Sequence, residues 1–458
     1  MRLSCWRFGR RLERISLVRR PMIYHLNRRG LARTALVVGL LLCGIRAAIG
    51  SLAFMLPGGA ILGWTRLPIV QCQVCSPSRV VTRGSASLTV DEYAAILTGH
   101  LSLDAKVGQL FLVQFSGTQA GPDTAQMINS EAAGGVVLYA DNIQSIAQMR
   151  ALTAQLQQMA SIPLIVSTDQ EGGPVNRLLS IVGSLPATAG LTSPAAAKER
   201  GVQDARILQQ IGVNLNLAPV IDVGSANPQL WDRTFGSNPE QVATLAGAYL
   251  AGLQQSGAVT GTLKHFPGLG STTVDPHVGL PILSRTRTQW ERIDLAPYQV
   301  LLQTHTVRAI MVTHELVPAV DKSMPASVSP ALIRGVLRQE LRFTGVVITD
   351  SLTMGALSAR WTMPQAAVLA VAAGSDLLIG PYTPDTLAQS EAAVKQAVSQ
   401  GMLSPAQIDQ AVEHDLALKL RMHLIPMPQG ASPVAPKPPV DTGMSGAVAA
   451  EMPRTPHD

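Results

Sequence analysis

The chain has 458 residues, of which 47% are hydrophobic and 14% are charged, a composition that excludes an intrinsically disordered protein. Its net charge of +6 comes from the first 34 residues, which hold ten arginines and one acidic residue and leave 26 basic and 29 acidic residues elsewhere. The rest of the chain is therefore mildly acidic, which argues against nucleic-acid binding.

The arginine-rich head, residues 1–34, precedes an apolar segment, residues 35–64, which Arg46 and Pro57 interrupt. About 20 apolar residues span a bilayer, and basic residues in front of such a segment stay in the cytoplasm. We therefore expect a cytoplasmic head and a membrane anchor. A cleaved signal sequence and an ordinary buried helix are the alternatives. Either an anchor or a signal would place the main body outside the cytoplasm, membrane-anchored or secreted.

Residues 65–87 are expected to form a linker. The linker holds Cys72 and Cys75, whose spacing lacks the two further ligands that a zinc site requires. Outside the cytoplasm these two cysteines could form a small disulfide, and the alternative is that they have no structural role.

From residue 88 to residue 424 short apolar runs alternate with longer amphipathic segments. The short runs are rich in Val, Ile and Leu, as expected for strands covered on both faces, and predict strands at 109–115, 134–139, 163–169, 214–222, 259–266, 308–314, 345–350 and 375–380. The longer segments predict helices at 122–132, 143–160, 193–211, 239–255, 287–304, 330–341, 363–373, 384–400 and 404–420. This alternation predicts an α/β fold with a parallel sheet, and eight strands favour a closed (β/α)8 TIM-type barrel that forms a single catalytic domain.

The tail, residues 425–458, contains eight prolines and almost no large apolar residues after Met427. Such a segment cannot bury enough apolar surface to fold, so we predict that it is disordered.

Two aspartates, Asp169 and Asp350, each end a predicted strand, where a barrel of this type carries its chemistry. Asp350 could act as a nucleophile or base, or it could cap a helix. Asp169 is followed by Glu171-Gly172-Gly173, and the glycines allow the backbone to turn sharply beside a ligand. A carboxylate there can accept hydrogen bonds from sugar hydroxyls, and an ordinary turn aspartate is the alternative.

Basic residues follow two other strands. Arg233 comes after the loop that follows the fourth strand, where it could reach the barrel mouth or neutralise a nearby acid. Lys264 and His265 end the fifth strand, and adjacent strand residues point to opposite faces. Both can face the mouth where the strand ends, at Phe266-Pro267-Gly268. Two adjacent donors suit a polyhydroxylated ligand, although a surface pair is an alternative.

A loop rich in Gly, Ser, Thr and Pro carries Asp275-Pro276-His277. Asp275 can bind one ring nitrogen of His277 and fix its tautomer, which leaves the other nitrogen free to transfer a proton. An incidental histidine in an Asx-type turn is the alternative. His314, at the end of the sixth strand, is expected to satisfy a core hydrogen bond or to line the site passively.

From about Leu103 to Leu420 the chain resembles glycoside hydrolase family 3, in its single-domain β-N-acetylhexosaminidase branch. Six motifs, in the family's order, carry this resemblance: Asp169-Gln170-Glu171-Gly172-Gly173, Ala218-Pro219-Val220-Ile221-Asp222, Arg233-Thr234-Phe235-Gly236, Lys264-His265-Phe266-Pro267-Gly268, Asp275-Pro276-His277 and Ile348-Thr349-Asp350-Ser351-Leu352-Thr353-Met354. The resemblance implies that Asp350 is the nucleophile and that His277, oriented by Asp275, is the general acid/base. It also implies a set of sugar-binding residues: Asp169, Arg233, Lys264 and His265.

The chain departs from the family pattern at three positions. Leu269 stands where the family usually has His, Pro174 where it usually has Arg, and Ser351 where it often has a second acid or Ala. Leu269 in particular could change the mobility of its loop or remove a polar contact, which bears on rate and substrate range more than on the reaction class.

The resemblance implies a retaining hydrolase that removes terminal β-linked N-acetylhexosamine from peptidoglycan- or chitin-derived glycans through a covalent glycosyl-enzyme. No metal or organic cofactor is expected, and the expected partners are a small glycan or muropeptide substrate and the membrane, with the protein a monomer. The alternatives are a hydrolase of the β-glucosidase or β-xylosidase type, a glycoside phosphorylase, and an inactive, membrane-tethered glycan-binding protein.

Overall fold

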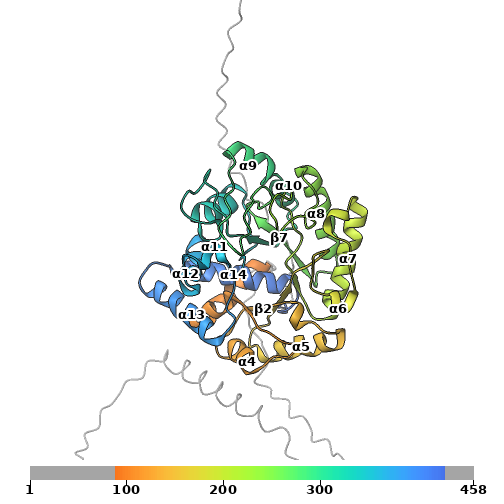
Figure 1. The fold of residues 1–458 in the computed structure, drawn as a ribbon. Helices are drawn as coiled ribbons and strands as arrows, with labels where there is room; N and C mark the ends of the chain where they lie inside the picture. The colour runs from red at the N-terminus through yellow and green to blue at the C-terminus, as the bar shows by residue number, and fades with distance from the viewer. Residues whose placement is uncertain (1–87, 429–458) are drawn as a thin grey trace, which may run out of the picture. The chain divides into compact units, whose positions relative to one another are not determined.

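The computed structural model describes residues 88–428 (Figure 1). The predicted head, anchor and linker, together with residues 429–458 of the predicted tail, lie outside the described residues. Between residues 88 and 428, none of the helices has both the length and the apolar character needed to cross a membrane.

Eight parallel strands form one sheet in the order β10-β1-β2-β3-β6-β7-β8-β9. Their bounds are β1 Phe111–Gln114, β2 Gly135–Leu138, β3 Ile165–Thr168, β6 Leu215–Asn216, β7 Thr260–Phe266, β8 Ala309–Val312, β9 Val346–Thr349 and β10 Leu378–Ile379. The two ends of the sheet meet where Ile348 of β9 pairs in parallel with Leu377, and the backbone N–H of Thr349 donates to the Leu377 carbonyl at 2.9 Å. The sheet therefore closes into the predicted (β/α)8 barrel.

Helices surround these strands (Figure 1). The α-helices are α2 Val90–Gly99, α3 Leu103–Gln109, α4 Pro122–Asn129, α5 Ile146–Met159, α6 Leu179–Val182, α7 Pro194–Gln210, α8 Pro239–Leu253, α9 Arg287–Ile293, α10 Ala296–Leu302, α11 Gly355–Ser358, α12 Met363–Ala373, α13 Pro384–Ser399 and α14 Pro405–Arg421. The 3₁₀-helices are η1 Ala140–Asn142, η2 Thr188–Gly190 and η3 Ala326–Val328, and η4 Ala331–Glu340 is a π-helix. Helices α7, α8, α13 and α14 each begin with a Ser, Thr or Asn whose side chain accepts a backbone N–H, followed by a proline that has no N–H to satisfy.

The structure differs from the predicted elements in several places. The short helices α6 and α11 were not predicted, and the strand expected over 214–222 is only Leu215–Asn216. The segment 287–304 forms two helices, α9 and α10, because Pro297 cannot donate a helical hydrogen bond and its ring clashes with the carbonyl four residues earlier. Helices α2 and α3 precede the first strand and were not predicted. A short antiparallel hairpin, β4 Gln170–Gly172 with β5 Val175–Asn176, follows β3.

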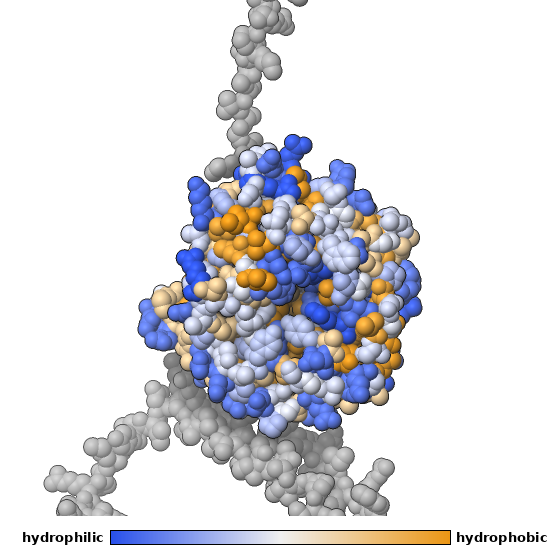
Figure 2. Space-filling model, in the orientation of Figure 1, coloured by the Kyte–Doolittle hydropathy of each residue, from blue (hydrophilic) through white to orange (hydrophobic). Residues whose placement is uncertain are grey.

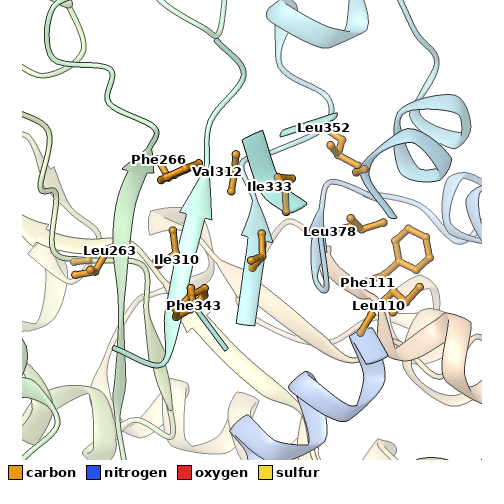
Figure 3. Packing of buried hydrophobic residues seen from close by; sticks show 14 of the residues in the cluster. Leu110, Phe111, Leu263, Phe266, Ile310, Val312, Ile333, Phe343, Leu352 and Leu378 are labelled. Atoms are coloured by element: carbon orange, nitrogen blue, oxygen red, sulfur yellow. The ribbon is translucent and has the colours of Figure 1, made fainter. Parts of the chain in front are cut away.

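Two apolar layers result from the alternation of side chains along the strands. On β8, Ala309 and Met311 point into the barrel, whereas Ile310 and Val312 pack against the outer helices. Figure 3 shows the outer layer, in which Leu263 and Phe266 of β7 lie beside the β8 side chains.

The interior of the barrel is filled rather than open. Its apolar layer joins inward residues of the strands with Leu418 and Met422, at and just beyond the end of α14. Below this layer, the buried Lys419 of α14 donates to Gln109, just before β1, at 2.6 Å. The N-terminal end of the barrel is thus closed by α14, which leaves the loops at the C-terminal ends of the strands to form a site.

Candidate active site

A pocket of about 770 Å³ opens at the C-terminal end of the barrel. Figure 2 shows a hollow near the centre of this face, with hydrophilic residues around it. The pocket is lined by Tyr139, Asp169, Pro174, Val175, Arg177, Pro228, Gln229, Trp231, Arg233, Lys264, His265, Leu269, Pro276, His277, Met311, Asp350, Ser351, Thr353, Met354 and Tyr382. Six of the seven residues predicted for the site therefore line one cavity, and the seventh, Asp275, contacts His277 from behind.

The β4–β5 hairpin brings two carboxylates to the pocket. Gly172 and Gly173 both have positive φ, of 91° and 54°, which side-chain-bearing residues rarely adopt. A Cβ on Gly172 would also lie 2.3 Å from Nη2 of Arg200. The predicted sharp turn is therefore present, and it places Glu171 beneath the pocket next to Asp169.

Four charged side chains, Asp169, Glu171, Arg233 and Lys264, form an ion-pair cluster at the base of the pocket. Lys264 Nζ lies 2.5 Å from Asp169 Oδ1 and 2.7 Å from Glu171 Oε1. Arg233 binds the same glutamate with two bonds, from Nε at 2.8 Å and from Nη2 at 2.9 Å. Glu171 thus holds both cations in place, and planar guanidinium-to-carboxylate pairing fixes the direction of Arg233.

Burial and charge act against each other in this cluster. Burial alone would raise the pKa of Glu171, but Arg233 and Lys264 hold it well below its usual range. Burial would lower the pKa of Lys264, yet Asp169 and Glu171 raise it above its ordinary value. Glu171, Lys264 and Arg233, whose pKa Glu171 raises, are therefore charged at neutral pH, and the remaining donors and acceptors of the cluster can bind sugar hydroxyls.

His265 is held from behind by Asp222. The ring Nδ1 lies 2.7 Å from Asp222 Oδ2, and because a carboxylate only accepts, Nδ1 carries the proton and Nε2 is left for the pocket. Strand β7 ends at Phe266, as predicted, but its pairing with β8 shifts register between Leu263 and Phe266 and the Lys264–His265 peptide is cis. Both side chains line the pocket, as the sequence predicted.

Asp350 directly follows β9 and is partly buried on the pocket wall. Burial would raise its pKa, but His314, His265, the backbone N–H of Ser351 and Lys264 together lower it. Ser351 N donates to Asp350 Oδ1 at 2.8 Å, which leaves Oδ2 free to point toward a reacting carbon. The result is an ionised carboxylate with one free oxygen, as a nucleophile requires.

His314 lies behind Asp350 and is fully buried. Its Nε2 is 2.8 Å from the Ser351 carbonyl and its Nδ1 is 2.7 Å from the Ser327 hydroxyl. Burial lowers its pKa despite the nearby Asp350. This histidine therefore satisfies core hydrogen bonds and supports the segment that follows Asp350, in line with its expected structural role.

The Asp275–His277 pair forms the outer side of the pocket. One carboxylate oxygen of Asp275, Oδ1, accepts both from the ring Nδ1 of His277 at 2.8 Å and from its backbone N–H at 2.9 Å. The His277 side chain is 61% exposed and that of Asp275 is 20% exposed. The pair has the geometry predicted for a proton-transfer dyad, with Nε2 of the imidazole free.

This loop docks on the segment that follows Asp350. The backbone N–H of Gly355 donates to the His277 carbonyl at 3.1 Å, and that of Ala356 donates to the Pro276 carbonyl at 3.0 Å. A Cβ on Gly355 would lie 2.5 Å from the His277 carbonyl oxygen, so glycine is needed for this approach. The segment that follows Asp350 and the loop that carries His277 are thus joined directly.

The three departures from the family pattern all line the pocket. Leu269 is buried in a small apolar cluster with Val220 and Leu230, and its backbone N–H donates to Asp222 at 2.6 Å. Pro174 is exposed at the turn of the β4–β5 hairpin, and the Ser351 hydroxyl pairs with that of Thr353 at 2.9 Å. None of the three interrupts the ion-pair cluster or the Asp275–His277 pair.

Several residues of the site were not assigned from the sequence. Glu171 and Asp222 lie within the recognised motifs, but their roles as anchors of Arg233, Lys264 and His265 depend on contacts across the barrel. Gln229 and Trp231, both on the pocket wall, lie in a loop that no motif covered. Trp231 is 64% exposed although it lines the pocket, which is a signal for ligand contact that the sequence does not contain.

Glu315 and Tyr298 are buried polar residues that do not line the pocket. Neither carboxyl oxygen of Glu315 has a hydrogen-bond partner among residues 88–428, and the same holds for the Tyr298 hydroxyl. Burial raises the pKa of Glu315 well above its ordinary value, with Asp222 and Asp294 acting in the same direction.

Throughout residues 88–428, no group of three or more His, Cys, Asp or Glu side chains is arranged so that it could hold a metal ion.

The closed barrel and the paired acid, base and sugar-binding groups at its mouth define an enzyme site of the type that cleaves glycosidic bonds. The model of the glycosyl hydrolase family 3 N-terminal domain matches residues 102–418, and the chain belongs to this family.

Known proteins agree with this assignment. The chain is 31% identical over 276 residues to a beta-hexosaminidase of Idiomarina loihiensis, covering 58% of this chain and 82% of that protein. It is 34% identical to a beta-hexosaminidase of Neisseria meningitidis over 57% of this chain and 74% of that protein.

Two solved structures have the same fold. A family 3 beta-N-acetylglucosaminidase from a Paenibacillus species superposes with a TM-score of 0.68 at 35% identity, covering 73% of this chain and 66% of that one. A beta-N-acetylhexosaminidase from Beutenbergia cavernae gives a TM-score of 0.65 at 30% identity over 70% of this chain and 98% of that one. The family and the barrel predicted from the sequence are confirmed.

Proposed function

We propose that this protein is a retaining β-N-acetylhexosaminidase that removes a terminal β-linked N-acetylglucosamine from a glycan. The beta-hexosaminidase relatives and the β-N-acetylglucosaminidase structures support this activity. The observation that carries the mechanism is that Asp350 and His277, from different loops, line the same pocket and are joined through backbone hydrogen bonds between their segments.

In the first step, the free oxygen of Asp350 attacks the anomeric carbon while the imidazolium of His277 gives its Nε2 proton to the leaving oxygen. The glycosidic bond breaks, the leaving group departs as an alcohol, and the sugar remains as an ester of Asp350. Asp275 accepts the Nδ1–H of His277 and stabilises its positive charge. An imidazolium beside Asp350 favours the ionised nucleophile, whereas a second carboxylate there would raise the pKa of Asp350 by repulsion.

In the second step, the neutral imidazole of His277 takes a proton from water, and the resulting hydroxide attacks the anomeric carbon. The bond to Asp350 breaks and the sugar is released with its original configuration. Throughout, Asp169, Arg233, Lys264 and His265 hold the hydroxyls of the sugar in place. Because Glu171 and Asp222 fix these groups before substrate arrives, little reorganisation is needed during the reaction.

The natural substrate class that we favour is a fragment of peptidoglycan or chitin. The support is the sequence: an arginine-rich head followed by an apolar segment predicts that the catalytic barrel lies outside the cytoplasm, where such glycans occur. In this proposal the protein acts as a monomer, is tethered to or released from the membrane, and requires no cofactor.

The full-length protein should be assayed against a panel of 4-nitrophenyl glycosides with and without phosphate. We expect the β-N-acetylglucosaminide to be cleaved fastest, with release of free N-acetylglucosamine whose first-formed anomer is β. Faster cleavage of the glucoside or xyloside would overturn the substrate assignment, and a sugar 1-phosphate product would overturn hydrolysis. Tight binding of muropeptides or chitin oligomers with no release of sugar would indicate a binding protein.

A further inference from the structure

We propose that Gln229 is a positioning residue that holds the carboxylate of Asp275 in the orientation needed to direct His277. Gln229 Nε2 donates to Asp275 Oδ2 at 2.6 Å, while the other oxygen, Oδ1, receives both hydrogen bonds from His277. This inference rests on the proposed role of His277 as the general acid/base.

The hydrogen bond separates the tasks of the two carboxylate oxygens. Because a carboxylate only accepts, the amide nitrogen of Gln229, not its oxygen, must face Asp275. An amide that donates to Oδ2 opposes rotation of the carboxylate, which would otherwise exchange Oδ1 and Oδ2. The His277 side chain is 61% exposed and has little packing of its own, so its direction depends on Asp275.

Gln229 is itself firmly held. Its backbone N–H donates at 3.0 Å to the side-chain oxygen of Asn227, a fully buried residue. The amide nitrogen of Asn227 then donates to the Thr272 hydroxyl and to the Val274 carbonyl, both at 2.8 Å. Three side-chain hydrogen bonds therefore join the loop that carries Gln229 to the loop that carries His277. Of these, the bond from Gln229 is the one made to the partner of the imidazole, Asp275.

The same residue also contacts the sugar-binding side of the pocket. Arg233 Nη1 donates at 2.9 Å to the backbone carbonyl of Gln229. The side chain of Gln229 thus contacts the proposed proton-transfer pair, while its backbone carbonyl contacts Arg233 of the ion-pair cluster. A substitution of the side chain leaves the carbonyl in place, so the two connections can be tested separately.

The first test replaces Gln229 by Met, which keeps the length of the side chain and removes the donor. We expect kcat/KM for an alkyl or disaccharide substrate to fall about tenfold, since a hydrogen bond to a charged group is lost, and kcat/KM for a 2,4-dinitrophenyl glycoside to fall less than about threefold. Inhibition by free N-acetylglucosamine should not change. The matched control is Gln203→Met, which removes a glutamine-to-carboxylate bond to Glu199, 3.1 Å long, on the exposed face of α7.

The second test is Gln229→Glu, which has a signature in pH that a purely structural role lacks. A carboxylic acid can donate to Asp275 as the amide does, whereas a carboxylate repels it. The ratio of kcat/KM between this variant and the wild type, for the unactivated substrate, should therefore fall as the pH rises from about 5 to about 8.

The outcomes distinguish this inference from the proposed function. If His277→Ala harms activated and unactivated substrates equally, the acid/base role of His277 is wrong and the inference fails with it. If His277→Ala shows the expected difference but Gln229→Met leaves both substrates unchanged, or slows both equally, Gln229 does not position the dyad. A ratio for Gln229→Glu that is constant across pH would also contradict the proposal.

Discussion

The base of the pocket and its outer loop are held in different ways. At the base, Lys264 and Glu171 have side chains only 2% and 1% exposed, and each charge has at least two partners. In the outer loop, His277 is mostly exposed and depends on Asp275, Gln229 and backbone hydrogen bonds from Gly355 and Ala356. The side chains at the base are held rigidly by buried ion pairs, whereas the loop is held by a few hydrogen bonds to its neighbours.

This difference matches the tasks that we assign to the two regions. A sugar must be held the same way through both chemical steps, and buried ion pairs that are formed in advance provide this rigidity. A proton donor must also admit a leaving group and then a water molecule, and an exposed loop residue can do both. Changes at the base should therefore affect all substrates or the stability of the fold, and changes in the loop should discriminate between leaving groups.

The largest effect is expected for Asp350→Ala. Without the nucleophile, turnover of all β-N-acetylglucosaminides should fall by roughly 10⁴-fold or more, whatever the leaving group. Steady-state kinetics with an aryl glycoside and a disaccharide measure this loss. Asp385→Ala, at an exposed site in the first turn of α13, is the control and should keep full activity. Near wild-type turnover of Asp350→Ala would rule out the assignment.

The next effect is that of His277→Ala, which should separate substrates. For poor leaving groups kcat/KM should fall about 10²- to 10⁴-fold, because they require a proton, whereas a dinitrophenyl glycoside should lose far less. The measurement is a plot of log kcat/KM against the pKa of the leaving group, which should become steeper in the variant. An unchanged slope would contradict the contrast between loop and base.

A stability effect is expected for Glu171→Gln. Removing this charge leaves Arg233 and Lys264 buried with fewer partners, so the free energy of unfolding should fall by about 3 kcal/mol. Because the pKa of Glu171 is lowered in the folded state, its contribution is present above the ordinary value of 4.5 and is lost as the pH falls further. Urea unfolding at pH 7 and pH 4 tests both statements, with Glu291→Gln, which removes the partner of Arg287 in a partly exposed ion pair, as control. Equal losses for the two variants at pH 7 would contradict the role of Glu171.

The smallest effect is expected for Glu315→Gln at low pH. The pKa of Glu315 is raised in the folded state, so the folded protein keeps a proton that the unfolded chain releases above its ordinary value of 4.5. The wild type therefore loses stability as the pH rises, and the variant does not. In urea unfolding, the free energies of unfolding of the two proteins should differ by less than about 1 kcal/mol at pH 5. Toward pH 8 the variant should become more stable relative to the wild type. If the free energy of unfolding of the variant instead falls relative to that of the wild type as the pH rises, Glu315 is ionised and paired.

The barrel could be predicted from the sequence because its signals are local. Each strand is a short Val-, Ile- or Leu-rich run, and several helices begin with a capping residue and a proline. All eight strands were found, seven of them within three residues of their bounds, whereas the fourth, predicted over 214–222, is only Leu215–Asn216. The single helix predicted over 287–304 was wrong. The amphipathic spacing of side chains continues through Pro297, but the proline interrupts the backbone hydrogen bonds, so two helices form.

The site was predictable only in part. Residues such as Asp350 and Lys264 follow strands directly, and parallel strands place their ends at one rim, so position along the chain gave their position in space. The contacts of Glu171 with Arg233 and of Gln229 with Asp275 join residues that are 62 and 46 positions apart. No local pattern specifies such pairs, because they depend on how neighbouring loops pack over the barrel.

The apolar layer beneath the pocket, completed by Leu418 and Met422, fills the interior of the barrel. Substrate and product therefore enter and leave by the same mouth at the C-terminal rim, so a released sugar must depart before the next glycan can bind. In the proposed reaction, added N-acetylglucosamine should consequently act as a competitive inhibitor, which initial rates at several concentrations of substrate and added sugar would measure.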